Sequence, residues 1–138
     1  MIIADTGFWV ALGNPRDDYH ALAVRTFATL REPLITTWPV MTEVCHLLLQ
    51  RRGTSAQIAF IELYRQGGLT VFEIDVSSAE RLDRLMKDYA DLPMDLADAS
   101  LVLLAEALGH GRILSTDRRD FHAYRWKNTR PFTNLLLS

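Results

Sequence analysis

The 138-residue chain contains one cysteine, Cys45, and has no long uncharged stretch. A single cysteine excludes an intrachain disulfide and is typical of a reducing compartment, so we expect a cytoplasmic protein. Stretches without Asp, Glu, Lys or Arg reach at most ten residues, as in 6–15 and 33–42. A membrane-spanning helix needs about 20 apolar residues. The sequence therefore predicts no membrane span, and the lack of a basic segment before an apolar one predicts no secretion signal.

The sequence also lacks low-complexity segments, linkers and internal repeats. With 49% hydrophobic and 23% charged residues, it has the composition of a folded protein and not of a disordered one. Its length suits one domain with a core of its own. We therefore predict a single domain over residues 1–138.

A strong excess of one charge is absent too, because the formal net charge is −2. The charges are unevenly distributed: residues 112–138 carry six basic and two acidic side chains, whereas residues 1–111 carry nine basic and fifteen acidic ones. An acidic protein is a poor general binder of polyanions, but it can bind cations where carboxylates converge. The placement of the carboxylates is therefore more informative than the net charge.

Short apolar segments alternate with helical patterns along the chain. The expected strands cover residues 2–4, 34–36, 69–74, 112–114 and 131–136. The expected helices cover residues 6–13 (capped by Thr6), 19–30, 39–52, 55–65, 77–89 and 93–108. Strands that alternate with helices predict an α/β fold with right-handed crossovers and a parallel sheet covered by helices on both faces.

Two aspartates come shortly after predicted strands. Asp5 directly follows residues 2–4, and Asp117 follows the strand at 112–114 and two hydroxyl residues. Ligands of parallel sheets bind beyond the carboxyl ends of the strands, so we expect both side chains at the same sheet edge. The alternative is that each aspartate caps the next helix, because Asp is a favoured N-cap residue.

Two further carboxylates lie on faces of the expected helices that are otherwise apolar. Glu43 shares its face with Leu47, and Asp98 shares its face with Leu101. A lone buried carboxylate is costly unless it is paired or binds a metal. The alternatives are a half-exposed position for Glu43 and a first-turn position favoured by the helix dipole for Asp98. Asp95 stands where the N-cap of that helix belongs.

Four carboxylates in one water-accessible site repel one another unless a cation neutralises them. All-oxygen ligation favours Mg²⁺ or Mn²⁺ over zinc. Such metals activate a water molecule and neutralise charge on phosphoryl oxygens. The sequence therefore predicts a metal-dependent site that cleaves phosphoesters, built from Asp5, Glu43, Asp98 and Asp117.

The order and spacing of these acids resemble the PIN domain and, more narrowly, the VapC-type ribonuclease toxins of prokaryotic toxin–antitoxin pairs. The matching segments span the chain and comprise residues 3–6, Glu43, residues 98–101 and residues 115–121. The resemblance implies a three-layer α/β/α sandwich with a central parallel sheet. It also implies a Mg²⁺-dependent endoribonuclease that leaves 5′-phosphate and 3′-hydroxyl ends on RNA. The usual partners in this family are a second copy of the chain and a cognate antitoxin whose tail blocks the active-site groove.

Carried over by position, the resemblance assigns catalytic and metal-binding roles to Asp5, Glu43, Asp98 and Asp117. We expect Asp5 and Asp98 to hold one Mg²⁺, while the other two acids bind a second ion or orient the attacking water. The resemblance gives supporting roles to Thr6, Ser115, Asp120 and Asp95. Gly7 stands where a small polar residue is common, which is a mild departure from the family pattern.

The basic residues between Arg112 and Arg130 are expected to surround Asp117. Arg118 and Arg119 are the candidates for contacts with RNA phosphates. The alternative for this cluster is an ordinary solvated surface.

Some of these residues also fit other functions. The tripeptide Asp5-Thr6-Gly7 also occurs in the active site of aspartic proteases, but that fold is all-β, whereas strands here alternate with helices. Two alternatives stay open within the PIN resemblance: a nuclease that processes RNA without an antitoxin, and a catalytically silent binding module. The intact set of four acids disfavours the silent module.

Overall fold

The computed structural model describes residues 1–137 of the chain. The strands are β1 (Ile2–Ala4), β2 (Leu34–Thr37), β3 (Thr70–Phe72), β4 (Arg112–Leu114), β5 (Arg125–Trp126), β6 (Arg130–Pro131) and β7 (Thr133–Asn134). The helices are α1 (Thr6–Gly13), α2 (His20–Thr29), α3 (Trp38–Arg52), α4 (Thr54–Arg65), α5 (Ala79–Asp88), α6 (Leu96–Leu108) and α7 (Asp120–Ala123). A 3₁₀ turn, η1 (Val76–Ser78), precedes α5 and replaces the first turn of the helix expected over 77–89.

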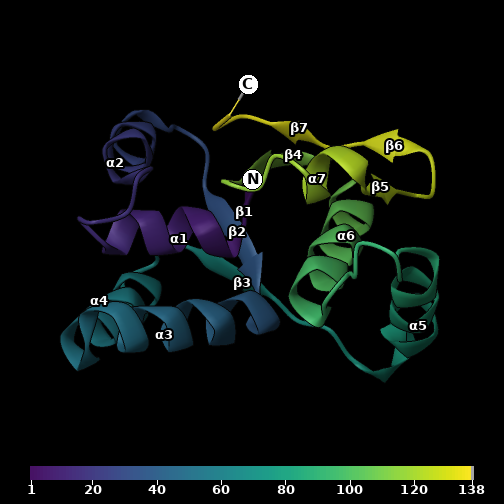
Figure 1. Cartoon of the computed structure of the whole chain (residues 1–138), viewed down its shortest axis with the longest axis horizontal. Helices are drawn as coiled ribbons and strands as arrows, with labels where there is room; N and C mark the ends of the chain where they lie inside the picture. Colours follow the sequence, from purple (N-terminus) through teal and green to yellow (C-terminus); the bar gives the residue numbers. More distant parts are fainter. Residues whose placement is uncertain (138) are drawn as a thin grey trace.

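A central five-stranded sheet has the order β3-β2-β1-β4-β7, and all of its pairings are parallel. Helices α1 to α4 lie on one side of the sheet and α5 and α6 on the other (Figure 1). The expected three-layer α/β/α sandwich with a central parallel sheet is therefore confirmed. The central strands β1 and β4 are largely apolar and buried, as expected for a sheet covered on both faces: Ile3 and Ile113 pair across the centre and are fully buried.

The order of the strands places a topological switch point between β1 and β4. From β1 the chain moves outward to β2 and then β3, and it later crosses back to add β4 and β7 on the other side of β1. The crossovers leave the loops after β1 and β4 diverging in opposite directions. In open α/β sheets, this is where ligands bind, beyond the carboxyl ends of the strands.

The ends of the helices follow local chemistry. Pro39 lies in the first turn of α3, where a missing N–H costs nothing. Gly53 and Gly109 end α3 and α6 with positive φ values of 91° and 76°, which a residue with a Cβ rarely adopts. The expectation that Thr6 caps α1 is wrong: Asp5 is the N-cap, and Thr6 is the first helical residue.

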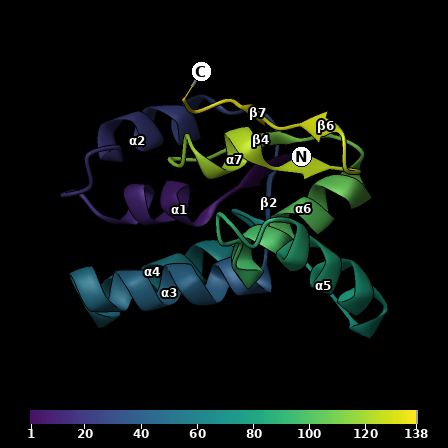
Figure 2. The same ribbon diagram turned by 45° about the vertical axis from the view of Figure 1, so that its right-hand side comes forward.

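The C-terminal part differs most from the sequence expectation. Residues 131–136 do not form one strand, because the chain divides between an antiparallel hairpin, β5–β6, and the parallel edge strand β7. Lys127 and Asn128 turn the hairpin with φ values of 47° and 65°. The short helix α7 and this hairpin lie together beside α6 (Figure 2). Neither segment has the apolar periodicity that reveals longer elements, which is why both were missed.

The described helices also bear on membrane insertion. None of the helices within residues 1–137 combines the length and the apolar character that a membrane crossing requires.

Candidate active site

Asp5 and Asp117 lie at the switch point, one after each of the two central strands. The backbone N–H of Asp5 donates to the carbonyl of Leu114 at 3.0 Å, so Asp5 is held directly beside the end of β4. Ser115 is fully buried, and its hydroxyl donates to Oδ2 of Asp5 at 3.0 Å. The same hydroxyl oxygen accepts from the backbone N–H of Asp117 at 2.9 Å. Ser115 therefore links the two aspartates, which agrees with the expectation of one shared sheet edge.

Asp5 is an unusually buried carboxylate, with only 7% of its surface exposed. Its Oδ1 accepts from the N–H of Thr6 at 2.7 Å, so the side chain also caps α1. The pKa of Asp5 is raised from 3.8 to about 7: burial is the main cause, and the charges of Asp117 and Glu43 add to it. The hydrogen bonds from Thr6 and Ser115 oppose this rise. The capping interpretation of Asp5 is therefore confirmed, and the cap does not prevent the same carboxylate from serving in a site.

Asp117 both borders the site and fixes the loop after it. Its Oδ1 accepts from the N–H groups of Arg119 and Asp120, each at 2.9 Å. These bonds start the turn that leads into α7 and leave Oδ2 without a partner among the described residues. Asp117 thus has one oxygen engaged in the turn and one available to a ligand.

Asp98 reaches the site from the first turn of α6, on the other side of the sheet from α1. It is half-buried, and its Oδ2 accepts from the phenol of Tyr124 at 2.8 Å. The pKa of Asp98 is raised from 3.8 to about 7, mainly by burial and further by the charges of Asp95 and Asp5. Asp95 is the N-cap of α6, as expected, because its Oδ1 accepts from the N–H of Asp98 at 2.8 Å.

Glu43 lies on α3 at the edge of an open groove between α3 and the start of α6. The groove has a volume of about 630 Å³, and Trp38, His46 and Leu96 also line it. Glu43 is half-buried, as its alternative interpretation held, yet its charge still raises the pKa of Asp5. Asp5 is therefore the acid that connects the other three: the charges of Asp117 and Glu43 raise its pKa, and its own charge raises the pKa of Asp98.

The residues with expected supporting roles differ in their burial and hydrogen bonding. Thr6 is buried, and its hydroxyl has no hydrogen-bond partner within residues 1–137. Asp120 begins α7 and pairs with Arg119 at 3.0 Å from Oδ1 to Nε, and burial raises its pKa. The charge of Asp120 also raises the pKa of Asp98, so it lies at the rim of the same site.

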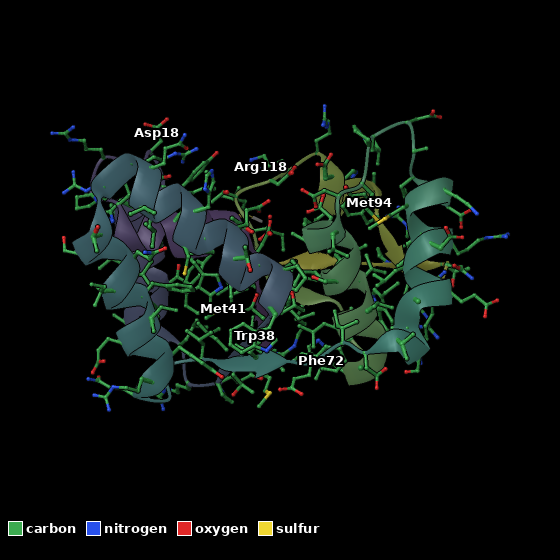
Figure 3. All side chains as sticks on the ribbon, turned by 90° about the horizontal axis from the view of Figure 1, so that it is seen from below. Asp18, Trp38, Met41, Phe72, Met94 and Arg118 are labelled. Atoms are coloured by element: carbon green, nitrogen blue, oxygen red, sulfur yellow. The ribbon has the colours of Figure 1, made fainter. Side chains whose placement is uncertain are left out.

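The basic residues do not form one ring around Asp117, contrary to expectation. Arg112 lies at the start of β4 and pairs with Glu32, at the end of the sheet away from Asp117. Only Arg118 and Arg119 lie on the loop beside Asp117, and Figure 3 shows Arg118 above the space between the α3 side and the α6 side. The remaining basic residues, Arg125, Lys127 and Arg130, belong to the β5–β6 hairpin, and Arg125 donates to three carbonyls at the C-terminal end of α7.

The donor set suits a hard divalent cation. Within residues 1–137, no three His, Cys, Asp or Glu side chains lie close enough together to enclose a metal ion by themselves. Mg²⁺ keeps several waters and takes one or two protein carboxylates, so a hydrated Mg²⁺ does not require such a group of three. The raised pKa values of Asp5 and Asp98 fit as well, because a nearby cation stabilises the ionised form that burial disfavours.

Residues 2–127 match the PIN domain family. The chain belongs to the PIN domain family. Ribonuclease VapC26 of Mycobacterium tuberculosis is 27% identical to it over 124 residues, which are 90% of this chain and 92% of VapC26. The 23S rRNA-specific endonuclease VapC20 of the same organism is 41% identical over 59 residues, which are 43% of this chain and 45% of VapC20.

A solved structure agrees with these relatives. The crystal structure of VapC20 from Mycobacterium tuberculosis, described as a sarcin-ricin loop cleaving toxin, matches with a TM-score of 0.79 and 24% identity. The match covers 86% of this chain and 92% of that chain, and it shows that the two share a fold. The predicted resemblance to VapC-type PIN ribonucleases is thereby confirmed.

The sequence did not single out Tyr124, and it noted Gly7 without a structural reason. Tyr124 is fully buried and donates to Asp98, but it lies 26 residues away in the chain and no local pattern marks it. Gly7 has a structural reason, because a Cβ at this position would lie 1.9 Å from the hydroxyl of Thr116. The small polar residue common at this position in the family would require Thr116 to move, so the departure at Gly7 reflects close packing of the two loops.

Proposed function

We propose that this PIN domain is a Mg²⁺-dependent endoribonuclease and the toxin of a type II toxin–antitoxin pair. One observation carries the proposal: the buried carboxylate of Asp5 at the switch point of the sheet is electrostatically coupled to Asp117, Glu43 and Asp98, and Asp5 and Asp98 both have raised pKa values. The names of the relatives, a ribonuclease and an rRNA-specific endonuclease, support RNA as the substrate.

In the proposed mechanism, the acids divide into two pairs. Asp5 and Asp98 would hold one Mg²⁺, for which Mn²⁺ could substitute, because their buried oxygens gain most from a cation. Asp117 and Glu43 would bind a second ion or orient the attacking water. When bound, the metal supplies Lewis-acid activation of water and neutralises charge on the phosphoryl oxygens.

Four other residues support this arrangement. Ser115 orients Asp5, Asp95 orients the first turn of α6, and Thr6 offers a buried hydroxyl beside Asp5. Asp120 holds a water of the second ion or caps the turn that begins α7.

Arg118 is the better candidate of the two arginines for contact with an RNA phosphate. Arg119 pairs with Asp120, whereas Arg118 is exposed and forms no ion pair within residues 1–137. Arg118→Ala should therefore weaken binding of RNA more than Arg119→Ala does, and fluorescence anisotropy with labelled RNA at two salt concentrations measures the difference. Equal losses in the two variants would contradict this assignment.

The proposed partners are a cognate antitoxin and a second copy of the chain, in the cytoplasm. Exposed apolar side chains on α3 and α4 offer a surface for a protein partner: Trp38, Leu49, Ile58 and Ile61. A PIN-type nuclease that processes RNA without an antitoxin is the alternative, and a small gene upstream that overlaps this one favours the toxin. A catalytically silent binding module is the second alternative.

Induced expression of the wild type and of Asp5→Asn, followed by mapping of RNA ends, tests the proposal. We expect growth arrest and new 5′-phosphate ends with the wild type only. Asp98→Ala should behave like Asp5→Asn, and Asp18→Asn, an exposed carboxylate on the α1–α2 loop, is the control that should keep full activity. Full cleavage by Asp5→Asn would refute the assigned chemistry, and no arrest and no new RNA ends with the wild type would favour the silent module.

A further inference from the structure

A buried phenol contacts one of the proposed metal ligands. Tyr124 is fully buried, and its hydroxyl donates to Oδ2 of Asp98 at 2.8 Å. A buried hydroxyl needs a hydrogen-bond partner, since leaving one unpaired costs about 1–3 kcal/mol. Phe would pack in the same space without that requirement. The carboxylate of Asp98, 26 residues away in the chain, is therefore the hydrogen-bond partner that the buried hydroxyl of Tyr124 requires.

The position of the phenol is fixed on several sides. The ring of Tyr124 packs edge-to-face against Tyr89, with centroids 5.1 Å apart, and against Phe121, at 5.2 Å. Its backbone N–H donates to the carbonyl of Asp120 at 2.9 Å. Its carbonyl accepts from Nη1 of Arg125, also at 2.9 Å. The hydroxyl therefore cannot follow Asp98 into another rotamer without disrupting the end of α7.

Such a rigid donor constrains the carboxylate that it contacts. With Oδ2 engaged by the phenol, only Oδ1 of Asp98 is free of the contacts that the described residues provide. A residue that hydrogen-bonds to a metal ligand without binding the metal itself orients that ligand. Loss of such a residue typically lowers metal affinity or activity 10–100-fold.

We propose that Tyr124 is a positioning residue that locks the carboxylate of Asp98, so that Asp98 binds the divalent cation through Oδ1 alone. This inference rests on the proposed function in one respect, the assignment of Asp98 as a metal ligand. It adds a role for α7 and the aromatic cluster of Tyr89, Phe121 and Tyr124, which connect the C-terminal part of the chain to the metal site.

The test is Mn²⁺ binding by Tyr124→Phe, measured by isothermal calorimetry, with Tyr89→Phe as the matched control. Both substitutions remove one phenolic oxygen from the same cluster, but the hydroxyl of Tyr89 accepts from the N–H of Arg125 and does not contact Asp98. We expect Tyr124→Phe to lower the Mn²⁺ affinity by about tenfold or more, and Tyr89→Phe to leave it unchanged. Thermal melts without metal report whether each variant is folded.

Asp98→Ala separates failure of this inference from failure of the proposed function. If Asp98→Ala loses Mn²⁺ affinity while Tyr124→Phe keeps it, the positioning role is refuted and the metal site stands. If Asp98→Ala binds Mn²⁺ like the wild type, Asp98 is not a ligand and both are refuted. Equal losses of affinity in Tyr124→Phe and Tyr89→Phe would show a general effect of loosening the cluster and would also refute the inference. A thermal-shift titration with Mn²⁺ is the second measurement, in which Tyr124→Phe should need more metal for the same rise in Tm.

Discussion

Replacement of Asp5 by asparagine should stabilise the metal-free protein at neutral pH, although it should abolish activity. The introduced amide keeps the contacts of the carboxylate: its oxygen can accept from the N–H of Thr6, and its NH₂ can donate to the hydroxyl of Ser115. What the substitution removes is the cost of holding a negative charge at a site that is only 7% exposed.

The magnitude follows from the pKa of Asp5, which rises from 3.8 in the unfolded chain to about 7 in the folded one. A raised pKa in a carboxylate means that the folded state holds its proton over a pH range in which the unfolded state has lost it. The stability of the wild type therefore falls as pH rises from about 4 to about 7. The full difference corresponds to an upper bound of about 4 kcal/mol above pH 7.

Chemical denaturation of wild type and Asp5→Asn at several pH values, with EDTA present, measures this difference. We expect Asp5→Asn to be more stable by about 2–4 kcal/mol at pH 8, and the gap to close near pH 4. Mg²⁺ should raise the stability of the wild type more than that of the variant, because only the wild type gains a neutralising cation. The control Asp18→Asn, at an exposed position, should match the wild type. A variant that is no more stable at pH 8, or a difference that does not change with pH, would refute the reasoning.

Three other predictions follow from the same site. Mg²⁺ affinity should fall as pH drops below about 7, because Asp5 and Asp98 then hold protons that the metal must displace. Calorimetry in two buffers should detect the release of these protons when Mg²⁺ binds. A binding heat that does not depend on the buffer at about pH 6.5 would contradict this. Gly7→Ala should cost about 1–3 kcal/mol in thermal melts, because the new Cβ would lie 1.9 Å from the hydroxyl of Thr116, and an unchanged Tm would show that Thr116 yields freely. Ser115→Ala should destabilise the metal-free chain by about 1–3 kcal/mol in urea, since it leaves buried polar groups unpaired, and wild-type stability would be the contrary result.

The sequence predicted the central fold well because the elements concerned have strong local signals. The segments that became β1, β2 and β4 are short runs that contain Ile or Leu, and α3 and α6 have a proline or aspartate at the start and a glycine at the end. The residues after 118 lack such signals. Helix α7 has one turn, and β5, β6 and β7 have two residues each, so their conformation depends on pairing with distant segments.

The residues of the candidate site also divide into those with a signal in the sequence and those without one. The sequence proposed the four acids from their positions after strands and on helix faces, and it correctly predicted the cap at Asp95. It could not separate Arg118 from Arg119, because each is next to one aspartate in the chain and only the structure shows that Arg119 pairs with Asp120. It also missed Tyr124, whose partner lies on another helix.

The sequence by itself determined which chemistry the chain can carry out, because residue type and spacing along one strand or helix fix the donors and the face on which they lie. Only the tertiary structure decided how those donors are charged and held. Burial of Asp5, the link through Ser115 and the phenol against Asp98 all depend on contacts between segments far apart in the chain. A carboxylate's pKa is set by its surroundings in space and not by its neighbours in sequence.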